Sequence, residues 1–511
     1  MNMADHLIRT SMIVALGAGT SLLPSLSRGD DQPPVDQGTL NALAVDAPEV
    51  AFLAAFEAGD ELTEMVFTTA RGVGANVREG QRFTRFPRAD LDGPGEWANH
   101  QPPREGGPQA QSCISCHALP YANGAGGVEL NVAIDPLQTG DPRSYLERNT
   151  APLFSLGAIQ RVAEEMTTEL QAQEAALAER ACTGRAPIVV PLTAKGVGFG
   201  TLSATPEIDG EACTPRIDRS KVAGVNEDLV VRAFGWKGTH PTIRSFARDA
   251  ANNEMGLQAD ELVGATDGDH DGYVSELTVG DLTALTIYMA ALERPTSMTE
   301  LAALGLVELS PMERSLIAAG EARFHEVGCA GCHKPEMLIE DPVFTEPSLH
   351  PAFAEPVLPS GATAAELGLS PETAIRFDLT ADLPNNRVVL PDGRVAELGA
   401  YETDAQGRAV VRRYSDFRRH EMGQELADPV DAYGIGASVW PTRGLAGVGS
   451  TGPWLHDGRA TTLDEAILAH GGEAAASRDR YAALSDVGRA QVVSFLANLV
   501  IVDLDPEDEE H

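Results

Sequence analysis

The pentapeptide Cys329-Ala330-Gly331-Cys332-His333 has a counterpart in the first half of the chain, Cys113-Ile114-Ser115-Cys116-His117. The C-x-x-C-H pattern is the attachment signature of a c-type haem. Its two thiols lie on one side of a helical turn and can each form a thioether with a haem vinyl group, while the histidine ligates the iron. A zinc knuckle or a redox C-x-x-C is the alternative, but the two motifs use four of only six cysteines. We therefore predict two covalently attached haem c groups, held by Cys113, Cys116 and His117 and by Cys329, Cys332 and His333.

Composition narrows the possible partners. The 511 residues carry a net charge of −37 and a sequence pI near 4.6, which argues against binding to nucleic acid or to an anionic membrane surface. A solvated acidic surface explains this charge, and docking of a basic electron-transfer protein is the alternative. No stretch approaches the ~20 consecutive apolar residues of a spanning helix, so no membrane span is expected.

Residues 1–28 have the pattern of a secretory signal peptide. Arg9 precedes an apolar run that begins at Met12 and continues to Leu23, and Pro24 ends it. In bacteria, haem is attached to C-x-x-C-H outside the cytoplasm. Both signals predict a periplasmic or otherwise exported protein.

Cys182 and Cys213 are left over once the haem cysteines are assigned. In an oxidising compartment a disulfide between them is the simplest expectation. Two free buried thiols are the alternative.

Helical periodicity predicts helices over about 48–69, 156–181, 280–292 and 485–502, and another after the capping box Ser310–Glu313. Short strands are expected at 188–192 and 197–202, and a hairpin at 387–398. We predict a mainly α fold of two cytochrome c-like haem domains with loop and short β insertions. The expected organisation is a signal peptide (1–28), a flexible leader (29–50), an N-terminal haem domain (51–300) with an insertion near 157–230, and a C-terminal haem domain (301–511).

An internal echo supports duplication. Phe234–Gly238 and Trp454–Gly458 are both aromatic- and glycine-bearing loops, and a helical stretch follows each of them. Each loop also follows one of the two haem motifs in the chain. The two halves therefore resemble each other, with imperfect spacing.

A third motif, Asp267-Gly-Asp269-His-Asp271-Gly272, matches the first half of a calcium-binding loop. Its twelfth position is Thr278 in place of the usual glutamate. Calcium held by Asp267, Asp269 and Asp271 is one interpretation, because three carboxylates on alternate residues repel one another. A solvated acidic turn is the other.

The chain resembles the bacterial di-haem oxidoreductases, relatives of the di-haem cytochrome c peroxidases, over nearly all of its length beyond the leader. The resemblance rests on Gly328–His333, Phe234–Gly238, Asp267–Leu277 and, most distinctively, Gly452–Glu473. It implies that Trp236 relays electrons between the haems, that Glu254 is the distal acid at the peroxide-binding haem, and that His470 is the distal ligand of the electron-accepting haem. The chain departs from the family pattern at Phe246, nearest to the family's distal glutamine, and at Lys237, where the family has aspartate.

Several distal assignments stay open. At the second haem Met422 is the alternative to His470, with His420 a further candidate. At the first haem Met255 could ligate the iron and close it, and Glu254 could be a helix-end carboxylate.

Three functional classes follow from the resemblance. The first is a peroxidase that receives electrons from a small redox protein or other donor at one haem and reduces peroxide or another small oxidant at the other. The second is an electron carrier without substrate chemistry. The third is an oxidase or oxygenase of an organic or protein substrate. The first is the predicted function.

Overall fold

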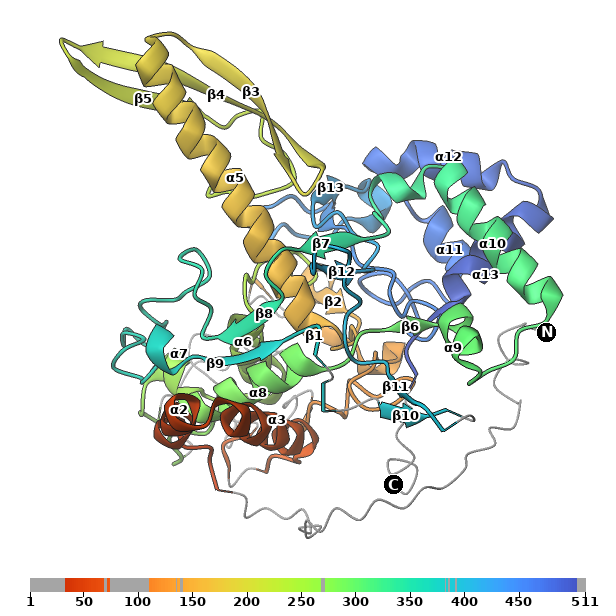
Figure 1. Cartoon of the computed structure of the whole chain (residues 1–511), viewed down its shortest axis with the longest axis horizontal. Helices are drawn as coiled ribbons and strands as arrows, with labels where there is room; N and C mark the ends of the chain where they lie inside the picture. Colours follow the sequence, from red (N-terminus) through yellow and green to blue (C-terminus); the bar gives the residue numbers. More distant parts are fainter. Residues whose placement is uncertain are drawn as a thin grey trace.

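The computed structural model describes residues 33–68, 71–73, 110–134, 136–137, 141–267, 272–381, 383–384, 387–390 and 393–502. These residues form a rounded body from which one long helix and a three-stranded sheet project as an arm (Figure 1). The helices are α2 (Gln37–Asp46), α3 (Pro48–Glu64), α5 (Leu156–Gly184), α6 (Ile243–Ala250), α7 (Asp260–Val263), α8 (Val279–Ala291), α9 (Met298–Leu304), α10 (Pro311–Glu326), α11 (Leu463–Leu468), α12 (Ala475–Ala482) and α13 (Asp486–Ala497).

The described strands pair with antiparallel neighbours, and all but β3, β4 and β5 span two to four residues. They are β1 (Val132–Ile134) with β2 (Leu146–Arg148), β3 (Ile188–Ala194) with β4 (Val197–Asp209) and β5 (Ala212–Asp218), β6 (Thr296–Ser297) with β15 (Leu499–Val500), β7 (Met337–Ile339) with β12 (Ala409–Val411), β8 (Val343–Glu346) with β9 (Ile375–Asp378), β10 (Arg387–Val389) with β11 (Val395–Glu397), and β13 (Arg419–Glu421) with β14 (Val439–Pro441).

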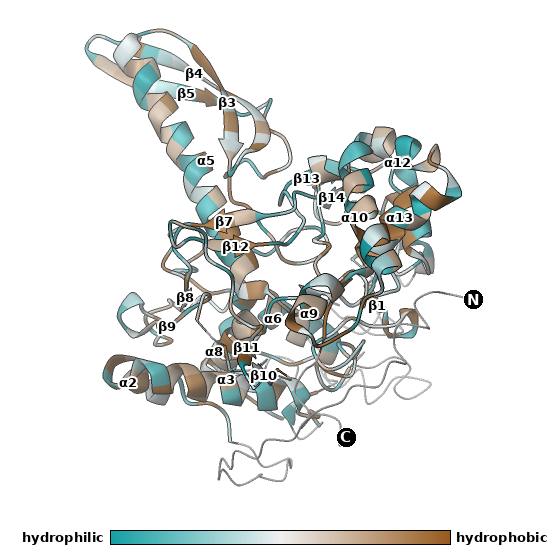
Figure 2. Cartoon of the chain, turned by 45° about the vertical axis from the view of Figure 1, so that its right-hand side comes forward, coloured by the Kyte–Doolittle hydropathy of each residue, from teal (hydrophilic) through white to brown (hydrophobic). Residues whose placement is uncertain are grey.

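Two pairs of crossing helices form the main packing contacts of the body. In α10 against α13, a Cβ on Gly320 would lie 2.0 Å from the carbonyl oxygen of Gln491, so only glycine permits this approach. In α3 against α8, a Cβ on Gly59 would lie 2.3 Å from the carbonyl oxygen of Ala284. α10 and α13 lie side by side (Figure 2), and Phe324 of α10 packs with Val492 and Phe495 of α13 in one hydrophobic cluster. The helix before the second motif therefore packs closely against α13.

Local sequence signals located several helix starts correctly. The side chains of Thr278 and Asp281 form a capping box at the start of α8. Those of Ser310 and Glu313 do the same at α10. Each box satisfies two N–H groups that a helix start leaves without intrahelical partners.

The arm consists of α5 with the sheet of β3, β4 and β5. A small hydrophobic cluster joins them, with Leu177 and Ala181 of α5 against Leu202 and Ala204 of β4. Cys182 and Cys213 form a disulfide that ties the end of α5 to β5, as predicted.

Removing this disulfide by replacing both cysteines with serine is expected to lower the stability of the arm by about 3 kcal/mol. The bond closes a loop of 31 residues, which restricts the unfolded chain. Hydrogen exchange of the arm amides measures the effect. Faster exchange confined to β5 and the end of α5 is the expected pattern, and exchange equal to that of the unmodified chain would contradict it.

The prediction of a mainly α fold made of two cytochrome c-like domains is wrong. Helices contain 37% of the residues and strands contain 17%. The strands of the described residues form seven small sheets. The strands at 337–339, 343–346 and 375–378, which were not predicted from the sequence, satisfy backbone N–H and C=O groups by antiparallel pairing.

The largest core cluster contains residues from both halves of the chain, from Leu40 to Ile501. Phe52 of α3, for example, stacks on Phe377 of β9 with ring centroids 4.7 Å apart. The domain boundary at 300 and 301 stays a prediction, and this core extends across it.

The structure bears differently on the two predicted N-terminal segments, the leader and the signal peptide. Residues 37–46, within the segment expected to be a flexible leader, form α2, and the amide of Val35 donates to Asp281 at 2.9 Å. The predicted signal peptide, residues 1–28, lies outside the described residues. Among the described helices, none combines the length and the apolar character needed to span a membrane.

The two loops of the internal repeat, Phe234–Gly238 and Trp454–Gly458, resemble each other more in structure than in sequence. Phe234 pairs with His240, and Trp454 pairs with Ala460, in isolated bridges of the same loop length. The helix that follows each loop is capped by a threonine eight positions after the first bridge residue, Thr242 at α6 and Thr462 at α11. Trp236 and His456 therefore occupy equivalent positions in the two halves.

Candidate functional site

The two C-x-x-C-H motifs adopt the same backbone turn. In Cys113–His117 the carbonyl of the first cysteine accepts hydrogen bonds from the amides of the second cysteine and the histidine, at 3.1 and 3.0 Å. In Cys329–His333 the corresponding distances are 3.3 and 2.9 Å. None of the four cysteines is in a disulfide. Both turns thus provide two thiols and a histidine in the order that haem attachment requires.

A backbone carbonyl lies beside Nδ1 of each motif histidine, and His117 has a further backbone hydrogen bond to Ala151. Nδ1 of His117 lies 3.2 Å from the oxygen of Gly124, and Nδ1 of His333 lies 3.1 Å from that of Tyr414. Burial lowers the pKa of each imidazole to about 4, so both rings are neutral at pH 7. Because the carbonyl can only accept, Nδ1 carries the proton and Nε2 keeps the lone pair that a metal needs.

His470 lies opposite His333. The two ring centroids are 6.3 Å apart, and Nδ1 of His470 is 2.8 Å from the carbonyl oxygen of Ala466. Burial lowers the pKa of His470, which keeps this ring neutral too. Two imidazoles on opposite sides of one metal, each bonded at about 2 Å, have ring centres roughly 6 Å apart once the ring size is added. The spacing of the two histidines fits one iron between them.

A cavity of about 300 Å³ contains both histidines and both cysteines of the second motif. Its wall is mainly apolar, as a porphyrin requires, and its residues come from α10, α11, α12, α13 and from loops in both halves of the chain. The apolar and aromatic residues of this wall include Phe324, Trp454, Leu463, Ile467, Val492 and Leu496.

Two arginines border the same cavity without a carboxylate partner among the described residues, Arg413 and Arg443. Burial lowers the pKa of each guanidinium to about 10, and in Arg443 the neighbouring charge of Arg413 adds to this effect. Two adjacent buried cations favour an anionic ligand. Haem carries two propionate carboxylates, so the donor set of this second cavity fits haem.

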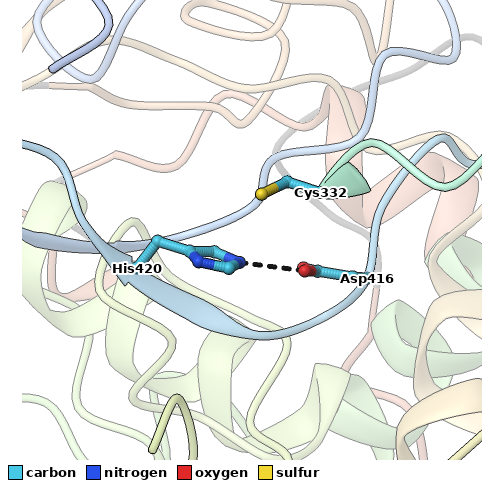
Figure 3. A group of neighbouring side chains, drawn as sticks. All are labelled: Cys332, Asp416 and His420. Carbon is cyan, nitrogen blue, oxygen red and sulfur yellow. Dashed lines mark hydrogen bonds and ion pairs between the residues drawn. The ribbon is translucent and has the colours of Figure 1, made fainter. Parts of the chain in front are cut away.

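Cys332, Asp416 and His420 form a compact group of metal-type ligands within the described part of the chain (Figure 3). Nε2 of His420 lies 2.9 Å from Asp416, and Nδ1 lies 2.9 Å from Glu473. Burial acts to lower the pKa of His420, but hydrogen bonds to Asp416, Cys332 and Glu473 raise it to about 10. This imidazolium donates from both nitrogens and has no lone pair for a metal. We interpret the group as an ion network beside the second motif, and His420 as a poor candidate for an iron ligand.

The first motif lies close to Glu254. The carbonyl of Glu254 accepts a hydrogen bond from the amide of Ala110 at 3.1 Å, and the carboxylate adds to the effect of burial in raising the pKa of Cys113 to about 12. Burial, together with the negative charge of Asp249, raises the pKa of Glu254 itself to about 7. Glu254 and Met255 belong to a π-helical turn, η4 (Ala251–Met255), which continues α6. Such turns often occur at functional sites.

Asn149 connects the surroundings of the two motifs. Its carbonyl accepts a hydrogen bond from Nε1 of Trp236 at 2.7 Å, and its amide donates to the carbonyl of His456 at 2.7 Å. Its side chain donates to the carbonyl of Gly126, two residues from the carbonyl that orients His117, at 2.9 Å. Trp236 itself lines the second cavity. The tryptophan predicted to lie between the haems is thus joined to the loop of the first motif by two successive hydrogen bonds through Asn149.

The other predicted site residues have separate places. Met422 also lines the second cavity and stays the alternative to His470. Asp267 accepts a hydrogen bond from the amide of Gly272 at 3.1 Å, but Asp269 and Asp271 lie outside the described residues, so the calcium site stays a prediction.

Sequence reasoning missed Arg413, Arg443, Asn149 and Trp440. Each acts through contacts with distant parts of the chain, and none stands in a motif. The only sequence signal was the absence of a nearby acidic residue beside Arg443.

Comparison with known families supports the resemblance read from the sequence. Residues 397–499 match the family described as "di-haem oxidoreductase, putative peroxidase". The matched segment contains Met422, Arg443 and His470 but neither C-x-x-C-H motif. No curated protein matches the chain.

Proposed function

We propose that this chain, whose C-terminal segment matches the di-haem oxidoreductases, is an exported c-type protein that binds one haem at each C-x-x-C-H motif and reduces peroxide. The observation that carries the proposal is the second cavity. There His333 and His470 face each other across 6.3 Å, each with its Nδ1 proton held by a backbone carbonyl. This arrangement suits an iron ligated from both sides, which is typical of a haem that handles electrons.

In this proposal the residues around the two motifs have different roles. Bound haem supplies a redox-active iron at each motif and a place for peroxide at the first. His333 and His470 would hold the second iron, while Arg413 and Arg443 balance the propionates. Trp236 and Asn149 would connect the second cavity to the loop whose Gly124 carbonyl lies beside His117.

Peroxide reduction requires two electrons and two protons: H₂O₂ + 2 H⁺ + 2 e⁻ → 2 H₂O. The electrons would come from a small redox protein through the second site. At the first site, the Glu254 carboxylate would take a proton from one peroxide oxygen and return it to the other. A carboxyl with a pKa of about 7 is suited to both transfers near neutral pH.

Export of the protein is part of the proposal. Covalent haem attachment takes place outside the cytoplasm, and the Cys182–Cys213 disulfide suits the same oxidising compartment. A signal peptide at residues 1–28 would direct the chain there.

The test is spectroscopy and turnover of the protein produced in a bacterial periplasm with haem-attachment machinery. We expect two haems per chain that resist acid extraction, one low-spin with two histidine ligands, and peroxide-dependent oxidation of a reduced donor. If both haems are six-coordinate in every redox state and peroxide changes nothing, the protein is an electron carrier. Consumption of an organic substrate without peroxide would favour an oxidase.

Replacing Glu254 with glutamine is expected to lower peroxide turnover by about 100-fold or more, because a positioned acid–base group contributes on the order of 10²–10⁴. Glutamine keeps the shape of the side chain but cannot carry the proton. In the unmodified protein the carboxylate must be ionised to accept the first proton, so kcat/KM should rise as pH increases through about 7. The variant should lose this step in its pH profile, and a retained step would assign it to another group.

A further inference from the structure

Three tryptophans line the cavity of the second motif, and they differ in the charges on their rings. The guanidinium carbon of Arg443 lies 4.4 Å from the ring centroid of Trp236. The ammonium of Lys237 lies 3.7 Å from the ring centroid of Trp440, which Arg148 also approaches to 5.3 Å. Among the described residues, no cation lies over the ring of Trp454.

The cation on Trp440 is held firmly. Lys237 is 2% exposed and donates to the carbonyls of Gly436, Ala437 and Val439 at 3.0, 2.7 and 3.0 Å. Asp428 lies 3.3 Å from this ammonium, but it also forms a bidentate pair with Arg148. Two cations share this carboxylate, and the charge of Asp431 also acts on Lys237.

The cation on Trp236 also has a fixed place. Arg443 donates to the carbonyl of Gly235 at 3.2 Å, and its nearest charged neighbour in the cavity is a second cation, Arg413. An anion bound in the cavity reduces the net charge there, but the guanidinium stays the group on the face of the ring.

Oxidation of an indole leaves a positive charge on the ring unless the Nε1 proton departs to a base. Nε1 of Trp236 donates to the carbonyl of Asn149 at 2.7 Å, that of Trp440 to Leu426 at 2.9 Å, and that of Trp454 to Val448 at 3.0 Å. A backbone carbonyl is not a base near neutral pH, so each oxidised ring would remain a radical cation. A cation already on the ring then repels the new charge, more strongly in the interior than in water.

We propose that Arg443 and Lys237 protect Trp236 and Trp440 from oxidation, so that Trp236 connects the two haem sites by tunnelling alone and Trp454 is the cavity tryptophan that loses an electron most readily. This inference rests on the proposed function for the two haem sites. It means that both electrons for peroxide come from the donor and not from these two rings.

The test uses light-generated tris(bipyridine)ruthenium(III), which removes one electron from a tryptophan and returns to ruthenium(II). The haem-loaded full chain carries Trp97→Phe in every sample, so that the three cavity tryptophans are compared. We expect a tryptophan radical in transient absorption and electron paramagnetic resonance that falls roughly tenfold in Trp454→Phe and is unchanged in Trp236→Phe and Trp440→Phe. A radical lost in Trp236→Phe or Trp440→Phe would overturn the proposal.

Charge variants provide the second arm. Both charge variants are made in the Trp454→Phe protein. Arg443→Gln is expected to restore a tryptophan radical, and adding Trp236→Phe should remove that radical again. Lys237→Met is expected to restore a radical that adding Trp440→Phe removes. Arg216→Gln, an exposed arginine on the arm, makes the same change of charge far from the cavity and should restore none. Failure of both charge variants to restore a signal would refute the proposal, even if one of them binds less haem.

The radical yield does not depend on peroxide. A protein that shows the expected radical pattern but no peroxide turnover would refute the proposed function alone. A protein that turns over peroxide but forms its radical on Trp236 would refute this inference alone.

Discussion

Replacing His470 with alanine is expected to convert the haem at the second motif from low-spin to high-spin and to lower peroxide turnover by at least about tenfold. The reason is the geometry of the pair. His470 faces His333 at 6.3 Å between ring centroids, and a single carbonyl holds its Nδ1 proton, which leaves Nε2 for the iron. Absorption and electron paramagnetic resonance of the oxidised protein measure the spin state directly.

Two controls make the result specific. Met422→Leu removes the other candidate ligand in the cavity and should leave the low-spin signal intact. Imidazole added to a His470→Gly variant should restore that signal, because the side chain it replaces leaves space of the same shape. If Met422→Leu loses the low-spin signal and His470→Ala keeps it, methionine is the ligand.

Arg244→Met is expected to lower the free energy of unfolding by about 3–5 kcal/mol, because it leaves buried carboxylates without their cation. Arg244 pairs with Glu261 and with Glu346, whose side chains are 0% and 2% exposed. These residues join α6 and α7 to β8, so the network connects the two halves of the chain. Urea unfolding of the haem-loaded protein measures the loss.

The same variant should be less damaging at pH 5 than at pH 8. Burial raises the pKa of Glu346 to about 7 even though Arg244 attracts its ionised form. At pH 5 this carboxyl is largely protonated in the folded protein, so its attraction to Arg244 contributes little. At pH 8 it is ionised, and without Arg244 it must take up a proton or remain buried and unpaired. An equal loss at both pH values would show that Glu346 is not part of the effect.

A matched exposed pair provides the comparison for Arg244. Arg143 pairs with Asp141 at 2.7 Å, but the arginine side chain is 89% exposed. Arg143→Met is expected to change the urea midpoint very little, because solvent screens the pair. A loss as large as that of Arg244→Met would mean that the charge change itself, and not burial, destabilises the protein.

Local features of the chain were predictable because their partners lie close in sequence. The capping boxes of α8 and α10 depend on side chains three positions apart, and the turns at Cys113–His117 and Cys329–His333 depend on backbone hydrogen bonds within five residues. The disulfide was predictable for a different reason, since only Cys182 and Cys213 remained after the motifs were assigned. The fold class was not predictable in the same way, because strands of two or three residues are too short to show an alternating pattern that distinguishes them from loops.

The pentapeptides by themselves predicted where haem would attach and which histidine would ligate each iron, since both predictions follow from the spacing within one helical turn. The tertiary structure alone decided what surrounds them. It placed Arg413 and Arg443 in one cavity, put Trp236 on the wall of the second site and joined it to the first through Asn149. These contacts connect residues far apart in the chain, where no periodicity or spacing records them. Only the packing of the two halves, fixed by the burial of one shared core, brings them together.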